Sequence, residues 1–375
     1  MRAAVVSVIG VWVCASGCGG KTLDLGHDTN EGPGYATPDT IAREVDAAPG
    51  TPTVIASHQY GAFNIAVDDT RVYWTTSGSP PPGRPDLAKE SCLVRSCMKD
   101  NCADTVVTYA SGGAMPGALR VNRTYVYWHS STDLLGPQQI LACPLDGCIG
   151  APTTIVESGA GAFAVDDAHI YWQSGGATLM QCSFDGCAGA PTMMTFQSGR
   201  GSALELDATD IFWIEGASTA SGAIMALPKD KSAPARTFVS KLRGPYSLTV
   251  DSGSVYWVEP DAQGSEVTLK RCPTTGCSGD PSIVASQQQY ARSLHVQGDY
   301  ADWFTADLPP LYPSNAVGTL RQCPITGCGA EPRIVADDQR SIVWTAIDAT
   351  HVYWTISDQR PDYIDGAVRR IRRRP

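Results

Sequence analysis

Hydrophobic and polar residues alternate in short runs along most of the chain, and one nine-residue pattern recurs seven times. A polar turn is followed by alternating apolar residues that end in tryptophan, as in "AVDDTRVYW" (66–74) and "AIDATHVYW" (346–354). Alternation with a period of two on both sides of a turn predicts a pair of β-strands. The seven tryptophans are Trp74, Trp128, Trp172, Trp213, Trp257, Trp303 and Trp354, at spacings of 54, 44, 41, 44, 46 and 51 residues.

Two further short strands are expected in each repeat. A loop, a third strand, a turn that in most repeats lies between two cysteines, and a fourth strand such as "TTIVES" or "PRIVAD" follow each tryptophan. Four short strands per repeat are typical of one β-propeller blade. The sequence therefore predicts an all-β fold over residues 51–375, a seven-bladed β-propeller of four-stranded antiparallel blades.

The two ends of this region complement each other. Residues 51–57, "TPTVIAS", have the sequence of a fourth strand but no blade precedes them, and residues 366–375, "GAVRRIRRRP", match a third strand and then stop. We expect the N-terminal strand to pair with the C-terminal strand, with Val54 near Val368. This pairing would close the ring and leave no unpaired sheet edge at the seam.

The N-terminus has the pattern of an export signal. The apolar run from Ala3 to Val13 is too short to span a bilayer but fits a secretory signal. The small residues before Cys18 resemble the lipobox of bacterial lipoproteins, which implies a signal peptide over 1–17 and lipid on Cys18. Ordinary signal cleavage is the alternative. Gly19 after the cysteine implies the outer membrane of a bacterial cell envelope, and the polar residues 18–50 are expected to be a flexible, lipidated tether.

The tryptophan repeats resemble the YWTD repeats of low-density-lipoprotein-receptor-type propellers. The resemblance lies in "VYWTT" (72–76), "HVYWTI" (351–356) and "PLDG" (144–147), and it implies the propeller fold. The aspartate that this family carries two residues after tryptophan is replaced in every repeat. The inter-blade hydrogen bonds that this aspartate makes, and the ligand specificity of the receptors, are therefore not implied.

Ten cysteines form five pairs with a separation of five residues. Cysteines that face each other across a four-residue hairpin loop lie within disulfide reach, and an exported chain meets an oxidising compartment. The fourth repeat has Leu227 and Ser232 at the two positions, so both cysteines are lost together. A metal site is the competing hypothesis, but each turn offers only two thiolates. We expect disulfides and no metal at Cys97/Cys102, Cys143/Cys148, Cys182/Cys187, Cys272/Cys277 and Cys323/Cys328.

One cysteine of the propeller region remains outside this scheme. Cys92 lies five residues before Cys97, so an alternative pairing in the first blade stays open.

Charge and motifs limit the possible functions. The chain has 28 basic and 38 acidic residues, with five of the arginines in the last seven positions, which argues against nucleic-acid binding by the propeller. Aspartates six residues before most of the tryptophans are expected to bond their own turns. No catalytic motif or cofactor motif is present, so we assign no catalytic residue and no cofactor.

Loop length singles out one side of the predicted ring. The segments from tryptophan to the third-strand cysteine position measure 23, 15, 10, 14, 15, 20 and 17 residues in blades one to seven. The three longest belong to blades six, seven and one, which are neighbours in a closed ring. Proline-rich loops with tyrosine and arginine suit recognition. We therefore predict a partner-binding lip with Arg84, Tyr312, Arg360 and Tyr363.

The sequence favours a non-catalytic binding or scaffold module for a protein or glycan partner, monomeric and held at the membrane by its N-terminal lipid. An exported hydrolase or lyase with its site in the central funnel is the main alternative, and a structural envelope component is a third. Propellers host all three classes, so the fold does not decide between them.

Overall fold

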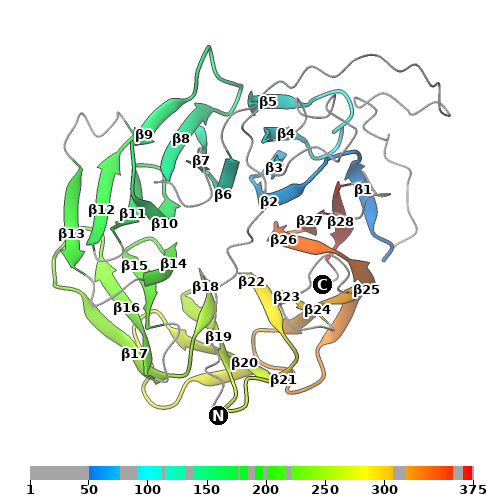
Figure 1. The fold of residues 1–375 in the computed structure, drawn as a ribbon. Coiled ribbons are helices and arrows are strands. Elements are labelled where there is room, and N and C mark those ends of the chain that lie inside the picture. The colour runs from blue at the N-terminus through cyan, green and yellow to red at the C-terminus, as the bar shows by residue number, and fades with distance from the viewer. Residues whose placement is uncertain are drawn as a thin grey trace, which may run out of the picture.

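The computed structural model describes residues 50–76, 92–111, 115–131, 138–175, 178–184, 191–196, 201–216, 221–306, 317–357 and 366–373. These residues form seven antiparallel sheets of four strands each, arranged as blades in a ring (Figure 1). The predicted seven-bladed propeller is confirmed. Within the described ranges no helix has the length and apolarity needed to cross a membrane.

Each blade begins at the centre of the ring and ends at its rim, and the blades are numbered in chain order. The innermost strands are β2 (Ala62–Val67), β6 (Met115–Val121), β10 (Ala160–Val165), β14 (Gly201–Leu206), β18 (Tyr246–Asp251), β22 (Ala291–Gln297) and β26 (Ile342–Ile347). The second strands are β3 (Arg71–Thr76), β7 (Tyr125–Ser131), β11 (His169–Ser174), β15 (Asp210–Glu215), β19 (Ser254–Pro260), β23 (Tyr300–Ala306) and β27 (His351–Ile356).

The outer half of each blade repeats the same order. The third strands are β4 (Val94–Met98), β8 (Gln139–Pro144), β12 (Thr178–Ser183), β16 (Gly222–Pro228), β20 (Val267–Pro273), β24 (Val317–Pro324) and β28 (Ala367–Arg372). The outermost strands are β5 (Val107–Ala110), β9 (Thr153–Val156), β13 (Thr192–Phe196), β17 (Arg236–Leu242), β21 (Ser282–Gln288), β25 (Arg333–Arg340) and, in blade 7, β1 (Thr53–Ala56).

The ring closes as the chain ends predicted. Strand β1 pairs antiparallel with β28, with Val54 opposite Arg369 and Ala56 opposite Val368. Blade 7 therefore has the strand order β26-β27-β28-β1, and the blue N-terminal strand lies beside the red C-terminal strand (Figure 1). Ile55 and Ala56 are buried, so the closing strand contributes apolar surface as well as hydrogen bonds.

Chain direction gives the ring two different faces. The turn face carries the turns between first and second strands and the hairpins between third and fourth strands. On this face of blade 7, the Arg373 N–H donates to the Thr350 oxygen at 2.7 Å. The connection face carries the loops between second and third strands and the links between blades; there, the Gln59 N–H donates to the Gly366 oxygen at 2.7 Å. Strand β1 runs from the turn face at Thr53 to the connection face at Ala56, so the described chain enters the ring on the turn face.

The core lies between the blades and follows from the aromatic pair in each repeat. Tyr73 and Trp74 are both fully buried but point to opposite sides of strand β3 because successive side chains alternate. Trp74 packs with Ile55 of blade 7, whereas Tyr73 packs with Trp128 of blade 2. Five further repeats have the same aromatic pair, blade 6 has Asp302 before its tryptophan, and all seven tryptophans are at most 3% exposed.

The innermost strands share one irregularity. Each shifts register against its second strand near the connection face, for example between Ala62 and Ile65 in blade 1 and between Ile342 and Thr345 in blade 7. A bulge of this kind re-aims the side chains of the extra residues. The bulges therefore determine which side chains the strands present at the centre of the ring.

Candidate functional site

The predicted lip residues Arg84, Tyr312, Arg360 and Tyr363 lie outside the described residues, so the lip stays a prediction. The ends of its loops are described. The residues that bracket the three loops lie on the connection face; they are Thr76 and Cys92, Ala306 and Val317, and Ser357 and Gly366. Strand β26 packs against both β2 and β22, which makes blades 6, 7 and 1 direct neighbours.

A buried glutamine precedes each of these three blades, in the link after β1 and at the ends of the outermost strands β21 and β25. Gln59, Gln288 and Gln339 each lie fifteen residues before the tryptophan of the blade, and none is more than 8% exposed. In each of them Nε2 donates to the backbone oxygen two residues earlier, at 2.7 to 2.8 Å. The glutamines thus fold each link back on itself and hold the base of the connection face.

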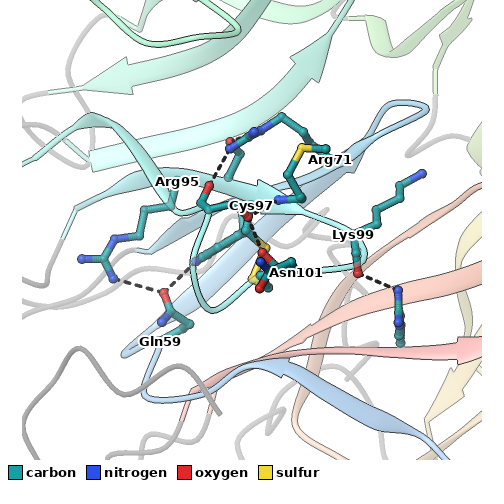
Figure 2. The surroundings of a disulfide bond; sticks show 12 residues. Gln59, Arg71, Arg95, Cys97, Lys99 and Asn101 are labelled. Carbon is teal, nitrogen blue, oxygen red and sulfur yellow. Dashed lines mark hydrogen bonds between the residues drawn. A yellow bond between two sulfur atoms is a disulfide. The ribbon is translucent and has the colours of Figure 1, made fainter. Parts of the chain in front are cut away.

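Gln59 also ties its link to the body of blade 1. Its Oε1 accepts a hydrogen bond from Nε1 of Trp74 at 2.8 Å and one from Nη1 of Arg95 at 3.3 Å (Figure 2). One buried side chain therefore joins the link, the core tryptophan and the third strand. Hydrogen bonds within the protein therefore hold this part of the connection face in place without a ligand.

Two links adopt backbone conformations that disfavour their residues. Thirteen residues before the blade tryptophan, Gly61 of blade 1 has φ 64°, and Tyr290 and Ser341 of blades 6 and 7 have φ 43° and 55°. Glycine tolerates positive φ, whereas tyrosine and serine pay a conformational cost. Strain of this type often collects at functional surfaces.

The turn-face aspartates bond their own turns, as predicted. Oδ1 of Asp68 accepts hydrogen bonds from the backbone N–H groups of Thr70 and Arg71, both at 2.7 Å. The same pattern recurs at Asn122, Asp166, Asp207 and Asp348. These side chains therefore have a structural role.

Asp251 departs from this prediction. Asp251 and Ser254 pair directly across a two-residue turn at Ser252 and Gly253, which both have positive φ. Asp251 Oδ2 accepts from the Ser252 hydroxyl at 2.5 Å and from the Gly298 N–H of blade 6 at 3.0 Å, and no backbone N–H of its own turn bonds it. The carboxylate links two blades instead of capping its own turn.

A lysine supplies an inter-blade contact that the repeat pattern did not predict. Nζ of Lys229, in blade 4, lies 2.9 Å from Oδ2 of Asp166, in blade 3. Burial raises the pKa of Asp166, but bonds from Lys229 and from the Ala168 and His169 backbone outweigh it and leave the pKa below its usual value. The signal was a lysine two residues after the third-strand cysteine position.

Blade 6 replaces its repeat tyrosine with a buried charge. Asp302 precedes Trp303, and its Oδ2 lies 2.6 Å from Nη2 of Arg373, with the two side chains 1% and 7% exposed. Gln322 Nε2 donates to the other oxygen at 2.9 Å. Burial raises the pKa of Asp302, which Arg373 and Gln322 oppose. Arg373 also donates to the Gln297 and Tyr300 oxygens, so this pair fixes the end of the chain to blade 6.

The layer of innermost-strand residues eight positions before the tryptophans is mixed: it holds Arg120, Glu205, Thr249 and His295, and alanine in the other three blades. Arg120 of β6 reaches past blade 3, and its Nη2 lies 3.8 Å from Oε1 of Glu205 on β14. The guanidinium lies 5.8 Å from the Phe163 ring between them. Crowding by the surrounding strands raises the pKa of Glu205, although Arg120 opposes this effect. The contact joins alternate blades, which no pattern along the chain could reveal.

Two histidines near this layer are neutral at pH 7. Burial lowers the pKa of His129 to about 4, and the charge of Arg120 adds to the effect. Burial likewise lowers the pKa of His295 to about 4, against a hydrogen bond with the Thr345 backbone. In the described part of the chain, no three histidine, cysteine, aspartate or glutamate side chains are grouped to hold a metal ion.

Four of the five predicted disulfides are present. Cys97–Cys102, Cys143–Cys148, Cys272–Cys277 and Cys323–Cys328 have Cα–Cα distances of 4.7, 5.2, 5.2 and 5.8 Å (Figure 2 shows Cys97). The first of these excludes the alternative Cys92–Cys97 pair. Cys182 is disulfide-bonded, and its predicted partner Cys187 lies outside the described residues; Cys92 is also disulfide-bonded.

No family model matches the sequence, and no curated protein matches it either. Solved structures do resemble the fold. The propeller of Dos1 aligns with a TM-score of 0.56 and 8% identity, covering 84% of this chain and 93% of that one. A chain of a mitotic checkpoint complex aligns with a TM-score of 0.55 and 11% identity, covering 95% and 100%. A chain of a nidogen/laminin complex aligns with a TM-score of 0.43 and 15% identity, covering 59% and 82%. At these identities the comparisons show the fold alone.

Proposed function

We propose that this chain is a lipid-anchored protein of the bacterial cell envelope whose propeller binds a protein or glycan partner without catalysis. The observation that carries the proposal is the grouping of the three longest loops on the connection face of adjacent blades 6, 7 and 1. The buried glutamines Gln59, Gln288 and Gln339 fix the described backbone just before each of these blades. A fixed base lowers the entropic cost of binding through such loops.

The two faces suit this arrangement. The described chain enters the ring on the turn face at Thr53, whereas the long loops leave from the connection face. A lipidated tether that continues from this face to the membrane would leave the connection face on the opposite side. The lip would then face away from the membrane, toward partners.

Anchoring and partner binding can be tested separately. Cys18→Ser is expected to release the protein from the membrane fraction, and retention of this variant in the membrane would contradict the lipid anchor. For binding, the three loops 77–91, 307–316 and 358–365 are replaced by short Gly-Ser turns, with replacement of residues 217–220 in blade 4 as the matched control. Capture from envelope extract followed by mass spectrometry is expected to lose one partner in the triple variant only. If the triple variant keeps that partner, the lip is not the binding surface.

One observation favours the second candidate function, an exported hydrolase or lyase. Glu205 is a carboxyl group with a raised pKa at the centre of the ring, next to an arginine, and raised carboxyl pKa values are common among catalytic acids. Glycoside hydrolysis usually needs a second carboxylate nearby. No other blade has an aspartate or glutamate at the position equivalent to Glu205, which argues against a glycoside hydrolase. Glu205→Gln would abolish turnover of any substrate found for the protein if this candidate is correct.

A further inference from the structure

One position on the innermost strands stands apart from its six equivalents. The residue ten positions before the blade tryptophan lies in the bulge of each innermost strand. Six blades carry a small residue there, namely Asn64, Ala118, Ala162, Ala203, Ser247 and Ser293, but blade 7 carries Trp344. Trp344 is 43% exposed, although every repeat tryptophan is buried.

The backbone under Trp344 is fixed on both sides. Its N–H donates to Oγ1 of Thr355 at 3.3 Å, and the same hydroxyl donates to the Phe63 oxygen of blade 1 at 2.5 Å. On the other side, Thr345 Oγ1 donates to the Ser293 oxygen of blade 6 at 3.3 Å. An exposed indole on a rigid strand is a costly feature for packing and a useful one for binding flat apolar surfaces.

Polar residues hold the equivalent position on the two innermost strands that neighbour Trp344. Asn64 lies on β2 and Ser293 on β22, the two innermost strands that pack against β26 (Figure 1). Among the described residues, neither the Asn64 amide nor the Ser293 hydroxyl makes a side-chain hydrogen bond, and Asn64 is only 8% exposed. Neither group is among the fully buried polar atoms that lack a partner, so each is open to water and can bond a polar ligand instead.

A cation completes the group. Arg292 precedes Ser293 and pairs across the sheet with Phe304, on the side of β22 from which His295 bonds the Thr345 backbone. Burial lowers the pKa of Arg292, and the neighbouring Tyr246 opposes this effect. Within the described ranges the Arg292 guanidinium has no carboxylate partner. A partly buried guanidinium without a counter-ion is costly, and an anionic ligand would supply one.

We infer that Trp344, Arg292, Ser293 and Asn64 form a binding subsite for a sugar ring that carries a carboxylate. The apolar C–H face of the ring lies on the Trp344 indole, the carboxylate pairs with Arg292, and the ring hydroxyls bond Ser293 and Asn64. The subsite lies at the connection-face end of the innermost strands of blades 6, 7 and 1. It rests on the proposed binding role of this face and names the ligand class.

Isothermal titration of the full chain with D-glucuronate, D-glucose, glucose 6-phosphate and acetate tests the inference. Glucuronate is expected to bind best. Trp344→Ala and Arg292→Met should each weaken binding by roughly tenfold or more, as expected for an aromatic anchor and a charge-assisted hydrogen bond. Trp344→Phe should lose less, because it keeps a ring. Arg236→Met changes a partly exposed arginine on the outermost strand β17 and should bind like the unchanged protein.

Several outcomes would overturn the inference. Equal binding of glucose removes the role of Arg292, equal binding of acetate removes the sugar, and stronger binding of glucose 6-phosphate replaces the carboxylate by a phosphate. If the unchanged, folded protein does not bind glucuronate, the subsite does not exist. The loop replacements described above report on the lip independently. Partner loss in that experiment together with no glucuronate binding would contradict only the subsite, whereas failure of both would contradict the binding role itself.

Discussion

Nζ of Lys99 in blade 1 lies 2.6 Å from Oδ2 of Asp348 in blade 7, across the seam where the ring closes. The side chains are 11% and 16% exposed. Nη1 of Arg370, on the closing strand pair, donates to the Lys99 oxygen at 2.8 Å. The seam is therefore held by an ion pair and a backbone contact in addition to the pairing of β1 with β28.

Lys99→Met is expected to destabilise the protein by about 1–3 kcal/mol, because it removes a charge-assisted hydrogen bond from a largely buried carboxylate. The exposed pair Arg123–Asp167, at 3.0 Å with side chains 86% and 53% exposed, is the control. Arg123→Met should change stability by no more than about 0.5 kcal/mol. Urea unfolding of both variants measures the difference. Equal losses would show that the seam pair contributes no more than a surface pair.

The closing strand should be essential, whereas the residues before it should not. A chain that begins at Gly50 keeps β1 and is expected to fold. A chain that begins at Ser57 loses the partner of β28 and the buried side chains of Ile55 and Ala56, which together are worth about 3 kcal/mol or more. Circular dichroism and size-exclusion chromatography compare the two. A monomeric, fully folded shorter chain would contradict the closure.

His129 should make stability depend on pH in mildly acidic solution. Its folded pKa of about 4 lies below the unfolded value of 6.5, so the unfolded state binds the proton first. Stability is then lost as the pH falls from about 6.5 toward 4, by at most about 1.4 kcal/mol per pH unit. His129→Leu should reduce this slope and leave the contribution of His295, whose pKa is also about 4, as measured by urea unfolding at several pH values. His58→Leu, at an exposed histidine, is the control.

Asp348 affects stability in a separate pH window. Burial raises the pKa of Asp348, but the bonds from Lys99, Thr350 and Tyr353 outweigh it and hold the pKa well below its ordinary value. The stability that Asp348 contributes is present above its unfolded pKa of 3.8 and is lost only as the pH falls further. An unchanged slope above pH 4 in His129→Leu would therefore contradict the assignment to His129.

The hairpin disulfides should each add a modest amount of stability. Loops of this length give about 2 kcal/mol in the chain-entropy account, so the double variant Cys323→Ser/Cys328→Ser should unfold at lower urea but keep its fold. Peptide mapping without reduction should show five bridges between cysteines five residues apart, including Cys182–Cys187, and will identify the partner of Cys92. A bridge between different blades at any of these ten positions would contradict the scheme.

Much of the fold could be predicted because a propeller repeats its physics. Most repeats place an acidic turn, an aromatic pair and a cysteine hairpin at the same offsets, so strand number and closure could be counted along the chain. Trp344 escaped this reasoning because it lies in a bulge, where the alternation that indicates side-chain direction breaks down. Its signal was present, however, as a large side chain at a position that is small in the other six repeats.

The sequence by itself determined the strands, the number of blades, the composite blade and the cysteine pairs, because these depend on local alternation and on short spacings. Only the tertiary structure decided which distant residues meet, such as Arg120 with Glu205, Lys99 with Asp348, and the group around Trp344. The physical reason is the ring itself. Blades that are neighbours in space bring together side chains from innermost strands as much as 280 residues apart in the chain, such as Ala62 in β2 and Ile342 in β26, and no spacing along the chain records which of them face each other.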